Sequence, residues 1–257
     1  MYLVIDIGAT KTLVALFSKR GRVVRRIKFR TSHGSKTFLR DLSQTLSRFK
    51  KRRIKAVVVA APGVVQKNCS IVFGNRNWSN FDILTPLKSL FDCPIYVGND
   101  ASIASLFESY NLPGKTIFLT FSTGLGGGIS NSNEISSESK DFEPGHWHYT
   151  YDGKDKEWED IASATAIESF YHVDRATDLR DKKILEDIAF RVSLGLDDII
   201  KKYKPDRIVL GGPLGKIFKL YAKYLPKDYK VELVRPKRPL ESVIYGGYLY
   251  AKQKEKA

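Results

Sequence analysis

Three short loops that contain glycine, each directly after an apolar run, constrain the fold of this chain more than any other feature. They occupy residues 6–12, 122–128 and 211–215. Glycine lets backbone N–H groups come close to phosphate oxygens, and hydroxyl and lysine side chains add further donors. One such loop is often only a turn, but three in succession indicate phosphate-binding chemistry.

Hydrophobic patterning predicts strands and helices that alternate along the opening half of the chain. Apolar and alternating runs predict strands at 2–6, 13–18, 22–29, 56–60 and 95–97. Apolar residues at helical spacing predict a helix over 36–49. Because the runs at 56–60 and 95–97 are continuously apolar, we expect parallel strands that are buried on both faces. The opening half is therefore expected to be α/β.

The same pattern restarts with a strand at 116–121, which predicts a second α/β half. It continues with a helix over 182–203, a strand over 206–210, a helix after Gly215 and a last helix near 240–251. Residues 131–156 are polar, as expected of a functional or disordered loop. We predict two domains, 1–113 with 241–257 and 114–240, and a cleft between them at the carboxyl ends of the strands.

The first loop combines groups that could bind the phosphates of a nucleotide. It offers a carboxylate, a glycine, two hydroxyls and a cation, from Asp6, Gly8, Thr10, Lys11 and Thr12. The Asp6 carboxylate could hold Mg²⁺ through water. A hairpin turn with a capping Asp explains these residues equally well when they are considered alone. The four glycines among residues 122–128 favour phosphate binding.

Asn99 and Asp100 follow the strand at 95–97 and precede a helix-like segment at 101–110. Capping of that helix is the plainest interpretation of the pair. The Asp100 carboxylate would also face the same cleft as the glycine loops and could take a proton from an attacking hydroxyl. General-base catalysis contributes about 10²- to 10⁴-fold, so positioning and charge neutralisation by the loops and Mg²⁺ must supply the rest.

Glu143, His146 and Glu159 lie in or just after the polar segment, where their acceptor groups suit the hydroxyls of a polyhydroxyl substrate. His146 and His148 could suggest a metal site. Because the chain has only four histidines and no cysteine nearby, we expect hydrogen bonding to the substrate instead. Trp78 could stack on a sugar face, but we expect its ring to fill the core.

The chain is basic, with 43 Lys and Arg against 28 Asp and Glu and a net charge of +15. This balance favours an anionic partner such as a nucleotide, polyphosphate or nucleic acid. The densest basic runs are 22–30 and 50–53, and we expect the second to be a solvated helix end. With two distant cysteines and no apolar run of signal-peptide or membrane-spanning length, we expect a cytoplasmic protein without a membrane partner.

Taken together, these residues resemble a sugar kinase of the ROK family, within the actin-like ATPase superfamily that includes hexokinase. The resemblance extends over nearly the whole chain. Residues 6–12, with Ala9 where a second glycine is usual, resemble the first phosphate motif, 122–128 the second, and 208–215 the adenosine motif. The sugar-domain motifs resemble Ala61-Pro62-Gly63, Asn77-Trp78 and Asn99-Asp100-Ala101. The implied fold has two α/β domains of the ribonuclease H-like type with an interdomain cleft.

The resemblance implies an enzyme that transfers the γ-phosphate of Mg-ATP to the 6-hydroxyl of a glucose-like hexose. Asp100 would be the catalytic base, and Asp6 would hold Mg²⁺ through water. The sugar would be bound by Gly63, Asn77, Asn99, Asp100, Glu143, His146 and Glu159. The nucleotide would be bound by Asp6, Gly8, Thr10, Lys11, Thr12, Thr123, Gly124, Gly126, Gly127, Gly211, Gly212 and Gly215. Dimers are common among proteins that resemble this one, so we expect a homodimer.

One departure from the family pattern concerns zinc. The family commonly carries a cysteine-rich zinc loop before the glutamate that Glu159 resembles. Residues 147–158 contain no cysteine, so only the sugar-binding role of His146 is carried over, and we expect no zinc site. This short pattern, with Tyr151-Asp152-Gly153 after the histidine, also resembles the polyphosphate glucokinases of the family. Because the third glycine loop suits adenosine, we favour ATP and keep polyphosphate as the alternative donor.

Two non-enzymatic classes remain as alternatives. Some relatives are sugar-sensing repressors, in which a DNA-binding helix-turn-helix segment precedes the first phosphate motif. Here that motif begins within the first ten residues, so we expect no nucleic-acid partner. The other class is a sugar or nucleotide sensor with the same fold and no turnover, against which the presence of Asp100 and Lys11 argues.

Overall fold

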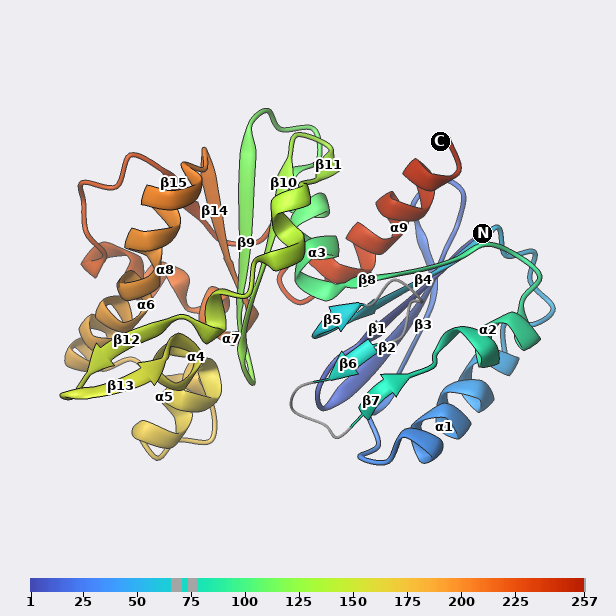
Figure 1. Ribbon diagram of the computed structural model, residues 1–257, viewed down its shortest axis with the longest axis horizontal. Helices are drawn as coiled ribbons and strands as arrows, with labels where there is room; N and C mark the ends of the chain where they lie inside the picture. Colours follow the sequence, from blue (N-terminus) through green and yellow to red (C-terminus); the bar gives the residue numbers. More distant parts are fainter. Residues whose placement is uncertain (66–70, 74–77, 257) are drawn as a thin grey trace. The chain divides into compact units, whose positions relative to one another are not determined.

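The computed structural model describes residues 1–65, 71–73 and 78–256 (Figure 1). The chain divides into two compact units: unit 1 comprises Met1–Ala104 and Val243–Ala257, and unit 2 comprises Ser105–Ser242. The chain passes between the units within helix α3 (Asp100–Ser109) and at the start of helix α9 (Ser242–Lys254). The domain boundaries predicted from the sequence, 113/114 and 240/241, lie just after α3 and just before α9.

Unit 1 is built on a five-stranded sheet in the order β3-β2-β1-β4-β8. The strands are β1 (Tyr2–Ile7), β2 (Lys11–Phe17), β3 (Val23–Arg30), β4 (Ala56–Ala61) and β8 (Ile95–Asn99). The first three are antiparallel neighbours, and β4 and β8 continue the sheet parallel to β1. β4 is completely buried, as its apolar run predicts. The prediction that β8 is also buried on both faces is wrong. β8 is only half-buried because it lies at an edge of the sheet.

Helices cover both faces of this sheet. On one face, α1 (Ser35–Ser47) and α2 (Leu84–Leu90) contribute to an apolar cluster in which Phe38 packs with Ile5 and Val14. α9 lies over the other face, where Tyr248 stacks on Phe17 with ring centroids 5.2 Å apart. Successive side chains of β1 and β2 point to opposite faces of the sheet. Most of them are buried, so these two strands present apolar side chains to the helices on both faces.

A small antiparallel sheet of β5 (Val64–Val65), β6 (Ile71–Phe73) and β7 (Trp78–Phe81) adds to unit 1. The Trp78 side chain, predicted to fill core, is buried beside Phe38 and donates through Nε1 to the His33 carbonyl oxygen at 2.7 Å. The core prediction for this ring is therefore confirmed.

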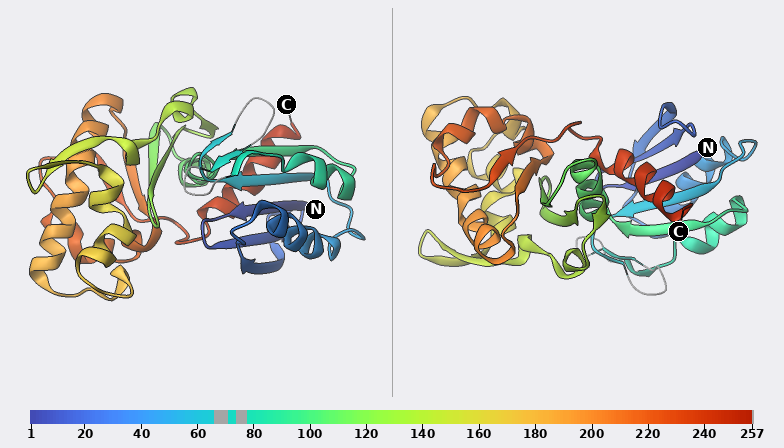
Figure 2. Two further views of the ribbon diagram at one scale, coloured as in Figure 1. Left: turned by 60° about the horizontal axis from the view of Figure 1, so that its bottom comes forward. Right: turned by 90° about the horizontal axis from the view of Figure 1, so that it is seen from above.

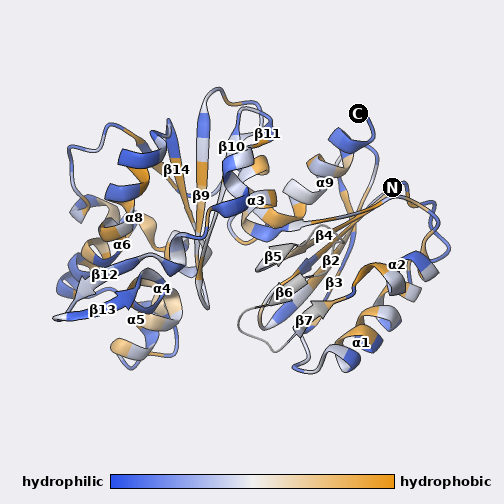
Figure 3. Ribbon diagram, in the orientation of Figure 1, coloured by the Kyte–Doolittle hydropathy of each residue, from blue (hydrophilic) through white to orange (hydrophobic). Residues whose placement is uncertain are grey.

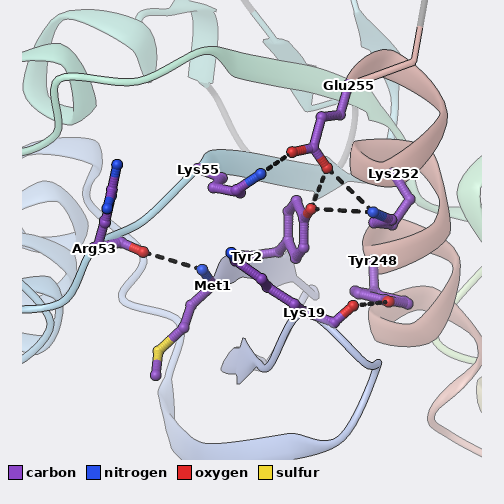
Figure 4. A network of polar contacts seen from close by, with 8 residues as sticks. All are labelled: Met1, Tyr2, Lys19, Arg53, Lys55, Tyr248, Lys252 and Glu255. Carbon is purple, nitrogen blue, oxygen red and sulfur yellow. Dashed lines mark hydrogen bonds and ion pairs between the residues drawn. The ribbon is translucent and has the colours of Figure 1, made fainter.

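Polar contacts fasten the end of α9 to the beginning of the chain (Figure 4). The Glu255 carboxylate accepts hydrogen bonds from the Lys55 ammonium and the Tyr2 hydroxyl, and Lys252 Nζ lies 3.2 Å from it. Tyr248 donates to the Lys19 carbonyl oxygen at 3.0 Å. Because the contacts with Lys55, Tyr2 and Lys252 favour the charged carboxylate, the pKa of Glu255 is lowered to about 2.

Unit 2 contains a second five-stranded sheet in the order β11-β10-β9-β14-β15. The strands are β9 (Lys115–Phe121), β10 (Leu125–Asn131), β11 (Glu134–Ile135), β14 (Arg207–Gly211) and β15 (Glu232–Val234). The helices are α4 (Trp158–Ala162), α5 (Ala164–Phe170), α6 (Lys182–Tyr203), α7 (Gly212–Lys216) and α8 (Phe218–Tyr221), with short 3₁₀ turns η3 (Ala176–Asp178) and η4 (Ala222–Tyr224). α6 has the bounds predicted for it and contacts α4 and α8. Figure 2 shows it as the long helix of unit 2, coloured from gold to orange.

Residues 131–156, expected to form a loop that is functional or disordered, are largely folded, so the expectation of a loop is wrong and a functional role stays a prediction. They include the 3₁₀ turns η1 (Ser137–Asp141) and η2 (Pro144–His146) and the hairpin of β12 (His148–Tyr151) and β13 (Lys154–Glu157). Asp152 and Gly153 both have positive φ, as a two-residue hairpin turn requires. Figure 3 shows this hairpin in hydrophilic colours, in contrast to apolar β4 and β14. Among the described residues, no helix is both long and apolar enough to span a bilayer.

Candidate active site

The first glycine loop is the turn of the β1–β2 hairpin in unit 1. Gly8 N donates to the Lys11 carbonyl oxygen at 3.1 Å. A Cβ atom on residue 8 would lie 2.8 Å from that oxygen, so this close approach of two backbone segments favours glycine. Thr10 and Lys11 are exposed, and their hydroxyl and ammonium groups are therefore accessible to a ligand at the turn.

Thr12, the third polar side chain predicted to contact phosphate, points into the protein instead. Its Oγ1 lies 2.9 Å from Thr31 Oγ1, and both side chains are buried. Thr31 Oγ1 donates to the Gly8 carbonyl oxygen at 2.8 Å, which leaves Thr12 as the donor to Thr31. The Thr31 N–H also donates to the Thr10 carbonyl oxygen at 3.0 Å. The two threonines thus hold the turn from inside, and the predicted Thr12 contact with phosphate is corrected to this supporting role.

Asn99 and Asp100 join β8 to α3, also in unit 1. Asn99 Oδ1 accepts a hydrogen bond from Ser102 N at 3.0 Å, so Asn99 caps the helix as its position predicts. Its Nδ2 donates to the carbonyl oxygen of Gly63, a residue with φ of 86°, at 3.3 Å. Asp100 Oδ1 accepts from Ala101 N at 2.7 Å, which restrains the carboxylate at the start of the helix. Asn77, the remaining sugar contact predicted for this unit, lies outside the described residues.

Asp6 and Asp100 lie at the carboxyl ends of β1 and β8, two parallel strands separated by β4. Burial, together with the charge of Asp100, raises the pKa of Asp6 to about 7 against the opposing charge of Lys28. Burial raises the pKa of Asp100 to about 6, although the hydrogen bond from Ala101 N lowers it. A carboxylate with a pKa near 6 is charged at neutral pH and still basic enough to accept a proton, as a general base must be.

The second glycine loop is the turn between β9 and β10 in unit 2, and it lies against Glu159. Glu159 Oε2 accepts a hydrogen bond from Leu125 N at 3.2 Å. A Cβ atom on Gly124 would lie 2.6 Å from that carboxylate oxygen, and one on Gly145 would lie 2.1 Å from the Leu125 carbonyl oxygen. Glycine at both positions therefore allows α4, η2 and the β9–β10 turn to meet. The structure brings the second loop, on which Thr123 is exposed, against Glu159 and the turn that contains His146.

His146 and Glu159 share this corner with Glu157, a residue that the sequence interpretation missed. His146 Nδ1 lies 3.0 Å from Glu157 Oε2, and ligand atoms of these three residues all lie within 4.8 Å of one another. The hydrogen bond with Glu157 raises the pKa of His146, as do the charges of Glu159 and Glu143, while burial lowers it. Glu157 ends β13, so its proximity to His146 depends on the hairpin that the sequence interpretation did not predict.

Several predicted nucleotide contacts in unit 2 are glycines with a packing role of their own. Gly126 and Gly127 lie within β10 and not in the turn, and a Cβ atom on Gly127 would lie 2.3 Å from the Phe142 ring. Gly211 ends β14 beside the Phe118 ring. A Cβ atom on Gly212 would lie 2.3 Å from the Phe121 carbonyl oxygen, and one on Gly215 would lie 2.2 Å from the Leu210 carbonyl oxygen. α8 is the helix expected after Gly215. It is preceded by α7, and the glycines at 212 and 215 let α7 lie directly against the ends of β9 and β14.

The two α/β units and their order of motifs define the actin-like ATPase fold. The model of the ROK family matches residues 2–245, and the chain belongs to that family.

Curated relatives include kinases for different sugars and a regulator. A fructokinase of Lactococcus lactis subsp. cremoris is 27% identical over 55% of this chain and 50% of its own length. A xylose repressor of Bacillus spizizenii is 24% identical over 59% of this chain and 46% of its own length. The chain thus spans about half the length of these relatives. An N-acetylmannosamine kinase of Yersinia pestis is 24% identical over 97% of this chain and 98% of its own length.

Solved structures share the fold over nearly the entire chain. A ROK family glucokinase from Streptomyces griseus, in complex with glucose and AMPPNP, has a TM-score of 0.78 at 19% identity and covers 98% of this chain and 99% of its own. An inorganic polyphosphate/ATP-glucomannokinase from Arthrobacter has a TM-score of 0.78 at 20% identity, with 98% of each chain covered. At these identities the similarity establishes the fold alone.

Proposed function

We propose that this protein phosphorylates the 6-hydroxyl of a glucose-like hexose with Mg-ATP as the donor. The observation that carries the proposal is the pair of carboxylates, Asp6 and Asp100, at the carboxyl ends of β1 and β8 in the unit that also contains the first glycine turn. The names of the kinase relatives support a sugar as the acceptor, although they differ in which sugar they name.

Asp100 is the base in this proposal. It accepts the proton of the 6-hydroxyl while that oxygen attacks the γ-phosphorus, the bond to the β–γ bridging oxygen breaks and ADP leaves. The short hydrogen bond from Ala101 N restrains the carboxylate, and its pKa of about 6 keeps it charged and basic at neutral pH. General-base assistance accounts for about 10²- to 10⁴-fold of rate, so the remainder must come from positioning of the donor and acceptor.

The donor set at the first turn suits a magnesium nucleotide. Asp6 offers carboxylate oxygens, which are the ligands that Mg²⁺ prefers, and it would hold the ion through water. When bound there, Mg²⁺ neutralises charge on the donor phosphates. The exposed Thr10 and Lys11 side chains would contact the phosphates beside Gly8. Thr123 and Gly124 would do so in unit 2, with Gly126 and Gly127 behind them, and Gly211, Gly212 and Gly215 would line the adenosine site.

Each unit contains groups that were predicted to contact the sugar. In unit 1 these are Asn99, Asp100 and the Gly63 backbone, and Asn77 keeps its predicted role. In unit 2 they are Glu143, His146 and Glu159. Support for this set is that ligand atoms of His146 and Glu159 lie within 4.8 Å of one another and that the charge of Glu143 raises the pKa of His146. The Glu159 carboxylate also accepts a hydrogen bond from Leu125 N, so a sugar hydroxyl bound to Glu159 would affect the backbone of the second glycine turn.

A homodimer, a cytoplasmic location and the absence of zinc stay predictions.

A panel of hexoses tests this proposal. Glucose, mannose, fructose and N-acetylmannosamine are each incubated with Mg-ATP, and the phosphosugar is measured directly. We expect one of them to be phosphorylated at its 6-hydroxyl with kcat/KM above that of the others. If no hexose is phosphorylated although a sugar or ATP still binds, the protein is a sensor without turnover. A relative named as a xylose repressor is consistent with that alternative.

Polyphosphate is a second candidate donor. The net charge of +15 favours a polyanion, and a structural neighbour is named as a polyphosphate/ATP enzyme. The same panel with polyphosphate in place of ATP separates the two donors.

A further inference from the structure

A row of four cations runs along β2 and β3 of unit 1 and starts at the first glycine turn. The register pairs Lys11 with Arg30, Leu13 with Lys28 and Ala15 with Arg26. Directly opposed residues of an antiparallel pair share a face, and so do residues two apart along a strand. Lys11, Arg26, Lys28 and Arg30 therefore project from one face of the sheet, and all four are exposed.

This face also carries Asp6. β1 pairs Asp6 with Leu13, and β2 pairs Leu13 with Lys28, so the three residues form one row across three strands. Lys28 is close enough to Asp6 to oppose the rise in the pKa of that carboxyl. The cation row is thus adjacent to the group proposed to hold Mg²⁺.

The opposite face of β3 is used for packing. Ile27 and Phe29 contact the apolar cluster beneath α1, and Phe29 lies against Phe38 with ring centroids 6.2 Å apart. Arg25 lies over the Phe49 ring, with its guanidinium carbon 5.8 Å from the ring centroid. Arg26, Lys28 and Arg30 lie on the other face of β3. α9 packs on that face of the sheet at Phe17, and the three cationic side chains are exposed.

The row is longer than a nucleotide needs. β3 is an edge strand, and at ~3.3 Å per residue the segment from Arg26 to Arg30 extends ~13 Å beyond the turn. A triphosphate held at Gly8 and Lys11 consists of three linked phosphate groups and would engage only the nearest cations. A longer chain of phosphates would continue along the strand and meet a cation at every second residue.

We propose that Lys11, Arg26, Lys28 and Arg30 form a binding track for linear inorganic polyphosphate, with one end of the chain at the first glycine turn. The proposal rests on the phosphoryl-transfer function proposed above and identifies the surface that would take the second donor. Single-stranded nucleic acid fits this face less well, because its binding normally requires aromatic side chains on which bases stack. Phe29, the aromatic residue of β3, faces the other side.

A binding experiment tests the track without depending on turnover. The track variant combines Arg26→Gln, Lys28→Gln and Arg30→Gln. The control variant combines Lys50→Gln, Lys51→Gln and Arg52→Gln, which removes the same charge from exposed residues outside the row. Binding of long-chain polyphosphate and of inorganic triphosphate is measured by equilibrium dialysis at several salt concentrations, after circular dichroism has shown that both variants are folded.

We expect the track variant to bind polyphosphate roughly tenfold more weakly or worse, since each exposed ion pair contributes modestly. Its dependence on salt should be shallower by about two to three counterions. Triphosphate binding should change less, and the control variant should bind polyphosphate within about twofold of the unmodified protein. Equal losses in both variants would show that the charge acts diffusely, and the track would be refuted. Tighter binding of a single-stranded oligonucleotide than of polyphosphate of equal charge would also overturn it, in favour of a nucleic-acid surface.

Discussion

Replacement of Thr31 by valine should loosen the first glycine turn from inside. The side chain is 1% exposed, and its hydroxyl joins Thr12 Oγ1 to the Gly8 carbonyl oxygen over distances of 2.9 Å and 2.8 Å. Valine has nearly the same shape, so Thr31→Val removes these two hydrogen bonds without opening a cavity. The N–H of residue 31 keeps its bond to the Thr10 carbonyl oxygen.

The magnitude follows from the two hydrogen bonds and from what they leave behind. A net hydrogen bond contributes about 1 kcal/mol, and a buried donor left without a partner costs about 1–3 kcal/mol. We therefore expect Thr31→Val to lower the free energy of unfolding by about 2 kcal/mol and the Tm by about 5 °C. Because Thr12→Val removes the stranded hydroxyl, the double variant should lose less than the sum of the two single variants.

Urea unfolding at 25 °C, followed by Trp fluorescence, measures these energies. Trp78 reports on unit 1, so Trp147 and Trp158, which lie in unit 2, are first replaced by phenylalanine. Thr45→Val is the matched control, since Thr45 is also buried and donates to the Asp41 carbonyl oxygen at 2.9 Å, but in α1. Both threonine variants should be destabilised, but only Thr31→Val should raise the KM for ATP more than the KM for the sugar. Strict additivity of Thr12→Val and Thr31→Val, or equal effects of Thr31→Val and Thr45→Val on that KM, would refute the reasoning.

Four further predictions concern other parts of the molecule. The kcat/KM for the sugar should rise with pH through about 6 and then level off, because Asp100 must be deprotonated to act as base; a pH profile measures this. Gly124→Ala should lower sugar phosphorylation about tenfold or more, measured by steady-state kinetics, because its Cβ atom would lie 2.6 Å from Glu159 Oε2. Glu255→Gln should lower the Tm at pH 7 and have a smaller effect at pH 3: a lowered pKa makes the carboxylate contribution present above its unfolded pKa and lost as pH falls toward about 2. Zinc chelation before the assay with Mg-ATP should leave the rate unchanged, and metal analysis should find no zinc at His146.

Each of these has an outcome that would contradict it. A rate independent of pH between 5 and 7 would exclude a base with the pKa of Asp100. An unaffected Gly124→Ala enzyme would mean that the Glu159 carboxylate moves aside easily. A Glu255→Gln effect on the Tm that grows as the pH falls would have the opposite sign to the one expected. Loss of activity when zinc is removed by the chelator would make His146 a metal ligand.

The strands and the long helix were predictable because burial imposes a period on the sequence. β4 is apolar at every position and buried at every position, and α6 repeats apolar residues at helical spacing over its full length. The Asn99 cap was also predictable, since it depends on a residue beside its own helix. Local signals of this kind need no knowledge of the rest of the fold.

The parts that were missed depend on where an element starts or on what lies next to it. The second strand was expected to begin at residue 13, so Thr12 was assigned to the loop; the strand begins at Lys11, and alternation then turns the Thr12 side chain inward. Glu157 comes beside His146 only through the β12–β13 hairpin, whose Asp152-Gly153 turn is a recognisable signal. Thr31 could not be found from the sequence, because only the pairing of β2 with β3 brings it to the turn.

The phosphorylation rate of the Asp100→Asn variant, at saturating hexose and Mg-ATP, tests the central claim most directly. Asparagine keeps the size of the side chain and an oxygen that can accept the hydrogen bond from Ala101 N, but it cannot take a proton. We predict that kcat falls by about 10²- to 10⁴-fold while the affinities for sugar and nucleotide change little. A variant that phosphorylates the hexose at the unmodified rate would show that Asp100 is not the base.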